Sequence, residues 1–115
     1  IEKYSVDVFL VNTGWIGGSP TSGASRVSIQ NTRSMITSIL DGSINNADFI
    51  KEEYFGLQIP KVLKNIDTNI LNPINSWNNK NQYHNEAISL AKKFKLNFNL
   101  YGKKVEYLIN SGPIV

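Results

Sequence analysis

The chain has no cysteine and only one histidine, His84, among its 115 residues. Disulfides and thiolate metal sites are therefore excluded, and so is a metal site built from several histidines. No apolar run approaches the roughly 20 residues that a membrane-spanning helix needs. The first residues lack the pattern of a signal peptide and look like the end of an interrupted helix. We therefore expect a cytoplasmic protein that contacts no membrane, and one that is an excised piece of a longer chain.

Clusters of like charge are also absent. The net charge is only +3, and the twelve lysines and arginines are spread along the sequence, with pairs at Lys92-Lys93 and Lys103-Lys104 but no longer run. A nucleic-acid surface needs a clustered basic face with interleaved aromatic residues. We therefore expect no nucleic-acid partner. A small basic RNA-binding domain remains an alternative, which salt-dependent RNA binding without a response to ATP would support.

What is present is an ordinary globular composition, 41% hydrophobic and 18% charged, in a length suited to one domain or part of one. Residues 6–11 form a nearly continuous apolar run, which predicts a strand buried on both faces. Short strand pieces and turns are predicted for residues 46–59. A long helix is predicted for residues 79–100, where aromatic and aliphatic side chains recur at helical spacing. The pattern indicates a small α/β domain.

A first helix is predicted from a cap at Asn31 or Thr32 to about Leu40, with Gly42 as its left-handed stop. Its apolar residues fall on one face and are expected to contribute to the core; they are Met35, Ile36, Ile39 and Leu40.

The stretch from Gly18 to Ser25 has the glycine and hydroxyl spacing of a phosphate-binding P-loop. Ala24, however, stands where the phosphate-binding lysine is required, and Pro20 removes a backbone donor. The β-branched residues of Val27-Ser28-Ile29 follow, where a P-loop needs a helix to begin at once. These departures exclude a true P-loop.

Arg26 and Thr32 are the more informative residues of this region. A guanidinium can stack on a base or donate two parallel hydrogen bonds to phosphate oxygens, and a threonine at a helix N-terminus can donate to an anion. The structural alternative is that Thr32 caps the helix while Arg26 is a solvated or ion-paired loop arginine.

The remaining candidates favour structural roles. Trp15 ends a predicted strand and is expected in the core rather than as a stacking platform. His84 lies near the polar face of the long predicted helix, and we expect it at the surface. Glu52 and Glu53 are adjacent and should point to different sides, which predicts a solvated loop rather than a carboxylate pair for acid–base chemistry.

Several short motifs follow one another in an order that resembles the C-terminal part of the ATP-dependent phosphoenolpyruvate carboxykinases. They are Leu10-Val11-Asn12-Thr13-Gly14-Trp15, Arg26-Val27-Ser28-Ile29 with Thr32-Arg33, Leu40-Asp41-Gly42, Phe55-Gly56-Leu57-Gln58-Ile59-Pro60, and Ile70-Leu71-Asn72-Pro73 with Trp77. The helix from Ala87 to Phe98 and the motif Ser111-Gly112-Pro113 also resemble the end of that family's sequences.

The resemblance implies an α/β fold in which residues 1–115 form a single partial domain, part of the C-terminal nucleotide-binding lobe. The family converts oxaloacetate and ATP to phosphoenolpyruvate, ADP and carbon dioxide in gluconeogenesis. Arg26 and Val27 match its adenine-side positions, and Thr32 matches the threonine that helps to seat the nucleotide.

By the same resemblance, the P-loop, the ligands of a divalent metal (Mg or Mn) and the oxaloacetate-binding arginines lie in upstream segments that this chain lacks. No catalytic residue is therefore expected here, the expected partners are the remainder of the parent chain, ATP and oxaloacetate, and the chain alone should be inactive. Ala24-Ser25 replaces the usual Gly-Lys before the arginine. The alternative is therefore a catalytically degenerate homologue segment that only binds nucleotide or has a structural role.

Overall fold

A computed structural model describes residues 2–18, 21 and 23–115 of the chain. Its α-helices and strands are short except for two. In chain order they are β1 (Trp15–Ile16), β2 (Ser25–Arg26), α1 (Ile29–Leu40), β3 (Phe49–Lys51), β4 (Gln58–Pro60), α2 (Thr68–Leu71) and α3 (Lys80–Phe98). Single turns and one longer 3-10 helix lie before, between and after them, at η1 (Glu2–Tyr4), η2 (Ser43–Asn46), η3 (Pro73–Ser76), η4 (Asn99–Tyr101) and η5 (Lys103–Ser111).

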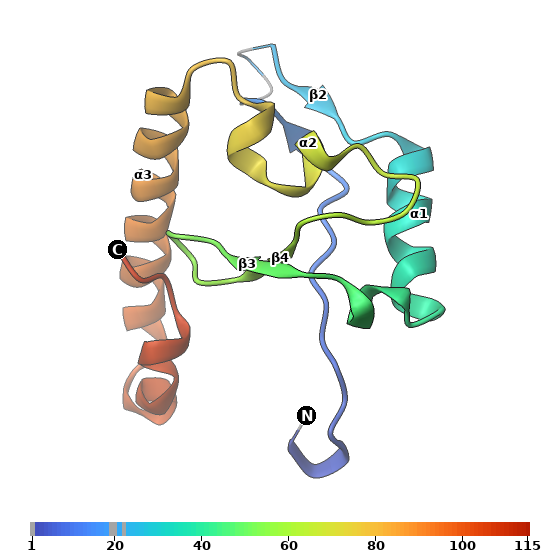
Figure 1. Cartoon of the computed structure of the whole chain (residues 1–115). Helices are drawn as coiled ribbons and strands as arrows, with labels where there is room; N and C mark the ends of the chain where they lie inside the picture. The colour runs from blue at the N-terminus through green and yellow to red at the C-terminus, as the bar shows by residue number, and fades with distance from the viewer. Residues whose placement is uncertain (1, 19–20, 22) are drawn as a thin grey trace.

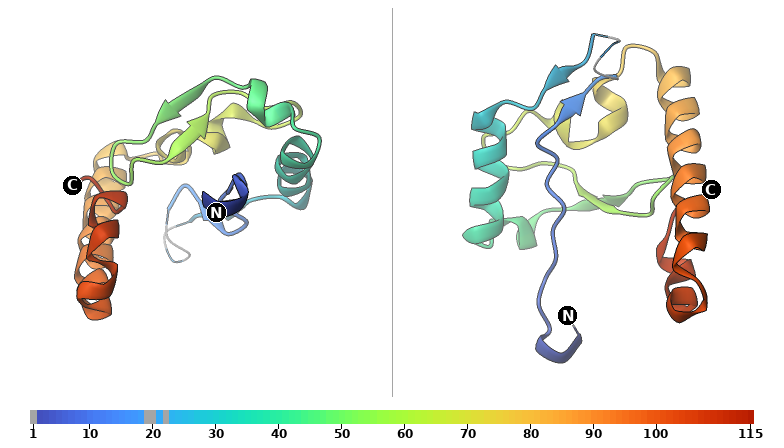
Figure 2. Two further views of the ribbon diagram at one scale, coloured as in Figure 1. Left: turned by 90° about the horizontal axis from the view of Figure 1, so that it is seen from below. Right: turned by 180° about the vertical axis from the view of Figure 1, so that it is seen from behind.

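The two long helices stand on opposite sides of the molecule, and the β3–β4 hairpin spans the distance between them (Figure 1). Seen from below, the chain forms an arch, with the N-terminal segment running through its concave side (Figure 2). The radius of gyration is 15.7 Å, compared with about 13 Å for a compact domain of this length. The chain is therefore more open than an independent domain.

The first helix begins earlier than the sequence predicts. Its N-cap is Ser28, whose side chain accepts a hydrogen bond from the backbone N–H of Asn31, so the prediction of a cap at Asn31 or Thr32 is wrong. A serine with extended backbone dihedrals satisfies one of the free N–H groups of the first turn. At the other end Gly42 has a φ of 75° and its N–H donates to the carbonyl of Ile39, which confirms the predicted left-handed stop.

A small core lies against α1. Its buried members are Ile44, Leu63 and Ile66, and the partly buried hydrophobic residues around it are Met35, Ile39, Ala47, Ile70 and Leu71. The predicted core face of α1 is therefore half right. Met35 and Ile39 contribute to the core, whereas Ile36 and Leu40 are 43% and 82% exposed.

The predicted buried strand at residues 6–11 is wrong. The structure describes no strand between residues 6 and 13, and the side chains of Val6, Val8 and Leu10 are exposed, Leu10 to 80%. A strand buried on both faces needs a ladder partner and two covering layers. Among the described residues this segment has no ladder partner, and it runs through the concave side of the arch (Figure 2).

The predicted strand pieces at residues 46–59 and the predicted long helix at residues 79–100 are confirmed. β3 and β4 form an antiparallel hairpin with Ile50 opposite Ile59, and α3 begins at the N-cap Asn79, whose side chain accepts from the N–H of Gln82. Ala91 is fully buried on α3. Neither this helix nor any other in the described part of the chain is long and apolar enough to cross a membrane.

Candidate functional site

The sequence-predicted site lies at the β1–β2 hairpin and the start of α1. The two strands pair antiparallel, with Trp15 opposite Arg26 and Ile16 opposite Ser25. The pairing continues for one more bond, because the backbone N–H of Val27 donates to the carbonyl of Gly14 at 2.9 Å. The hairpin thus fixes the backbone on both sides of Arg26 immediately before the chain enters α1.

The glycine-rich loop between these strands is a hairpin loop. A P-loop connects a strand directly to the helix whose N-terminus binds the phosphates, whereas this loop leads into β2, which pairs back onto β1. The structure therefore agrees with the exclusion of a P-loop. Ser19, Pro20 and Ser22 lie outside the described residues, while Ala24 is half-buried at the point where the loop joins β2.

Val27 and Arg26 face different environments. Val27 is only 8% exposed and lines a large concavity of about 1240 Å³ under the arch, together with apolar residues of the N-terminal segment, α1 and the β3–β4 hairpin. Arg26 is exposed, and its guanidinium carbon lies 5.9 Å from the centroid of the Trp15 ring. The valine therefore anchors the strand while the arginine presents a positive charge to the outside.

Trp15 corrects another expectation. It is 46% exposed rather than in the core, and its ring lies beneath the guanidinium of Arg26. A cation over an aromatic face is attracted by the negative charge of the π-system. The expected core position of Trp15 is therefore wrong, and an arginine lies over its exposed ring.

Thr32 lies one turn into α1 and is half-buried, and its N–H donates to the carbonyl of Ser28 at 3.0 Å. Its backbone donor is therefore used within the helix, so neither a capping role nor a free N-terminal N–H is available to it. Only its side-chain hydroxyl can serve a ligand. Arg26, Val27 and Thr32 are brought onto one continuous strand-to-helix segment.

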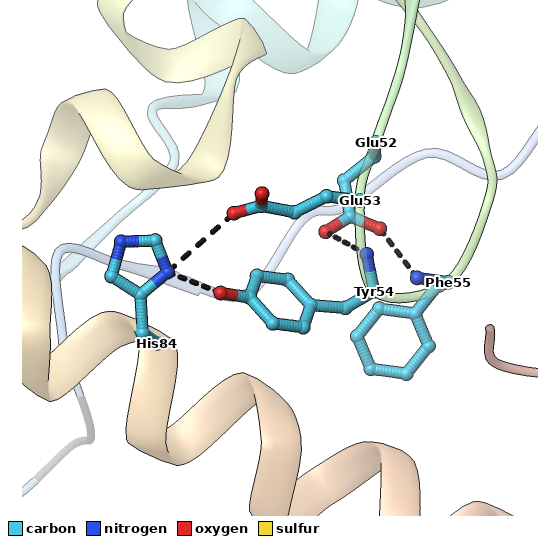
Figure 3. Close-up of polar contacts among 5 residues, drawn as sticks. All are labelled: Glu52, Glu53, Tyr54, Phe55 and His84. Carbon is cyan, nitrogen blue, oxygen red and sulfur yellow. Dashed lines mark hydrogen bonds and ion pairs between the residues drawn. The ribbon is translucent and has the colours of Figure 1, made fainter. Parts of the chain in front are cut away.

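A second polar cluster, which the sequence did not predict, occupies the turn between β3 and β4 (Figure 3). Glu52 is 9% exposed, and its two carboxylate oxygens accept hydrogen bonds from the backbone N–H groups of Tyr54 and Phe55 at 3.0 and 2.6 Å. The prediction of a solvated loop is therefore wrong for Glu52. It is correct for Glu53, whose side chain is 63% exposed.

The same turn contacts α3 through His84. The Tyr54 hydroxyl and Nδ1 of His84 share a hydrogen bond, and Oε1 of Glu53 lies 3.5 Å from the same nitrogen. A carboxylate therefore lies beside His84 in space, and the His84 side chain is 37% exposed, so it is half-buried rather than fully at the surface as expected. From the other side, the N–H of Ile114 donates to the carbonyl of Tyr54 at 2.9 Å. Tyr54 thus joins the turn, α3 and the C-terminal residues.

Two tyrosines of this cluster have raised pKa values. Burial raises the pKa of Tyr83 to about 12, and the negative charge of Glu52 adds to the effect. Burial is also the main reason that the pKa of Tyr54 lies above its ordinary value, with Glu53 contributing. Both phenols therefore stay protonated and uncharged at neutral pH, and Tyr83 packs edge-on against the ring of Tyr54.

The structure offers no metal centre among the residues it describes. Over residues 2–18, 21 and 23–115, His, Asp and Glu side chains do not gather in any group of three that could hold an ion. The single histidine of the sequence is engaged with Tyr54 and Glu53.

Comparison with known proteins gives consistent matches. The family model described as phosphoenolpyruvate carboxykinase matches residues 1–69. The chain is 43% identical over 112 residues to the phosphoenolpyruvate carboxykinase (ATP) of Staphylococcus haemolyticus (strain JCSC1435), and 41% identical over 112 residues to that of Staphylococcus aureus (strain MRSA252). Each match covers 97% of this chain and 21% of the relative.

The chain thus spans about a fifth of the length of the curated relatives that it matches. Its helices and short strands form an α/β part of a domain of that family. The match begins before the β1–β2 hairpin and extends beyond α1, so it includes the whole candidate site. This chain belongs to the family of the ATP-dependent phosphoenolpyruvate carboxykinases.

Proposed function

We propose that this chain is the C-terminal part of an ATP-dependent phosphoenolpyruvate carboxykinase and supplies part of the ATP pocket in its nucleotide-binding lobe. The whole enzyme would convert oxaloacetate and ATP to phosphoenolpyruvate, ADP and carbon dioxide in the cytoplasm. The observation that carries the proposal is the exposed guanidinium of Arg26, held by a paired hairpin directly before α1 in a chain of this family.

Each proposed site residue has a distinct task. Arg26 has a planar guanidinium that can stack on a base or donate two parallel bonds to phosphate oxygens. Val27 would contact the adenine side and keep the strand in place through its buried side chain and its bond to Gly14. The Thr32 hydroxyl, one turn further along, would donate to the nucleotide. None of these three residues is proposed as a catalytic residue.

The remainder of the parent chain is the proposed partner of the concave face. The chain exposes 8801 Å², whereas a compact monomer of 12.9 kDa exposes about 6300 Å². The surplus is of the size found on one side of a large obligate interface. Apolar side chains such as Phe9, Val27 and Leu57 line the concavity, so covering it would be favourable.

Since no metal site is found in the described residues, a Mg or Mn ion of the whole enzyme would bind in the remainder of the parent chain.

The test is substitution of Arg26 in the full-length protein. Arg26→Ala should raise the KM for ATP by roughly tenfold or more, because one or two charge-assisted hydrogen bonds are lost, and should leave the KM for oxaloacetate nearly unchanged. Arg33→Ala is the matched control, since Arg33 is an exposed arginine on α1. Equal effects of Arg26→Ala on both KM values would contradict the assignment.

The isolated 115-residue chain should form no phosphoenolpyruvate from oxaloacetate and ATP. Formation of product by the chain alone would overturn the proposal that catalytic groups lie elsewhere. If the full-length protein bound ATP without any turnover, the chain would instead belong to a degenerate homologue, and the replacement of the usual Gly-Lys by Ala24-Ser25 would be the first place to look for the cause.

A further inference from the structure

We infer that Trp15 is a positioning residue for the nucleotide pocket, which holds the guanidinium of Arg26 in place without neutralising its charge. The inference deepens the proposed function and rests on it. It starts from the register of the β1–β2 pair, in which Trp15 and Arg26 are directly opposite. Opposite residues of an antiparallel pair project from the same face with their Cβ atoms about 5 Å apart.

The contact between the two side chains follows from that register. The guanidinium carbon lies 5.9 Å from the centre of the Trp15 ring, within the range in which a cation over an aromatic ring is attracted. An arginine side chain has several rotatable bonds and loses considerable rotamer freedom when it is fixed. A rigid ring opposite it reduces that loss before the ligand arrives, and this is how preorganisation improves affinity.

The ring itself is held by its backbone. The side chain of Asn12 accepts a hydrogen bond from the N–H of Gly14 at 2.9 Å and donates to the carbonyl of Trp15 at 3.5 Å. The carbonyl of Gly14 in turn accepts from Val27 on the opposite strand. The backbone on both sides of Trp15 is thus held by hydrogen bonds, which places the ring on the same face as Arg26.

That the side chain beside Arg26 is an aromatic ring and not a carboxylate matters for nucleotide binding. In the part of the chain that the structure describes, no carboxylate forms an ion pair with Arg26, and the aromatic ring takes that place. A carboxylate would occupy the fork of N–H donors and cancel the charge. A ring, unlike a carboxylate, carries no net negative charge, so the contact leaves the positive charge of Arg26 in place. Arg26 is therefore neither simply solvated nor ion-paired, which were the two structural alternatives.

The experiment compares kinetic constants of the full-length protein carrying Trp15→Leu, Trp15→Phe, Arg26→Ala and the double variant Trp15→Leu/Arg26→Ala. Trp15→Leu should raise the KM for ATP about 2- to 30-fold, leave the KM for oxaloacetate within twofold, and change kcat little. Trp15→Phe keeps an aromatic face and should recover most of the loss. The double variant should be no worse than Arg26→Ala alone, since Trp15 acts through Arg26.

Trp77→Leu is the matched control. Trp77 lines the same small cavity as Trp15, of about 160 Å³, but its ring contact is with Tyr83. It should not change the ratio of the two KM values. The inference is overturned if Trp15→Leu and Arg26→Ala add, if Trp15→Leu raises both KM values alike, or if Trp15→Phe behaves like Trp15→Leu. If Arg26→Ala itself leaves the KM for ATP unchanged, the proposed function fails instead.

Discussion

The carboxylate of Glu52 should determine how often the turn between β3 and β4 opens. Its two oxygens accept the N–H groups of Tyr54 and Phe55 in a buried position. A hydrogen bond to a charged group contributes about 1.5 to 3 kcal/mol, and a buried donor left without an acceptor adds a cost. Because water can enter a turn that has lost its side-chain acceptor, we expect Glu52→Ala to lower the free energy of local opening by about 3 kcal/mol.

The assay is amide hydrogen exchange in the full-length protein, which reports local opening residue by residue. A change of 3 kcal/mol corresponds to exchange more than about 100-fold faster at Tyr54 and Phe55. Glu53→Ala is the control one residue away, since that side chain is 63% exposed and interacts with the side chains of His84 and Tyr54 rather than with the backbone of the turn; it should change these rates by less than about threefold. Equal acceleration by both variants would refute the reasoning.

Two further predictions concern backbone packing and alkaline pH. Gly17→Ala should lower the free energy of unfolding, measured in urea titrations, by about 1 to 3 kcal/mol more than Gly23→Ala does. Both glycines have a positive φ, but at Gly17 a Cβ would also lie 2.6 Å from the carbonyl oxygen of Ser76, whereas at Gly23 it would meet open space. Equal losses of stability in the two variants would contradict this. Tyr83 has a pKa raised to about 12, against about 10 in the unfolded chain, so the folded state keeps its proton over that interval. Stability should therefore be intact below pH 10 and fall by about 1 to 2 kcal/mol as the pH rises to about 12, after allowance for partial exposure; Tyr83→Phe should reduce this slope, and an unchanged slope would count against the assignment.

Local patterns predicted those parts of the fold that local interactions determine. The span of α3, the hairpin region and the glycine stop after α1 follow from helical spacing, turn residues and a positive φ, all of which are short-range effects. The start of α1 was missed because Ser28, Asn31 and Thr32 are all suitable caps. Only the pairing of β2 with β1, which ends just before Ser28, decides among them.

Predictions that depended on what covers a side chain did less well. Leu10, Ile36 and Leu40 have the pattern of buried residues, yet they are exposed in this structure. Hydrophobic patterning indicates which side chains are buried in the folded protein. It does not indicate whether the segment that buries them belongs to the same stretch of chain. This chain spans about a fifth of its relatives' length, so side chains that the pattern marks as buried can be exposed in it.

In the candidate site, too, the sequence predicted local features and missed contacts between distant segments. Arg26 could be singled out because its residue type and neighbours were informative in sequence, and its role as a nucleotide contact stays a prediction. The approach of His84 to Tyr54 could not be found, because 30 residues separate them and no spacing rule links a hairpin turn to a distant helix. The contact of Trp15 with Arg26 could have been found only by assuming the strand pairing, which places them opposite each other.

The arch also has a consequence for how this segment folds. The element pairs in closest contact are sequence neighbours, namely β1 with β2, α1 with η2, β3 with β4, α2 with η3, and α3 with η4. Contacts between neighbouring residues form with little loop-closure cost and therefore quickly. We expect each of these pairs to form early as a separate local unit. Fixing α1 and α3 relative to one another is then the slow step, which waits for a chain segment that fills the space between them.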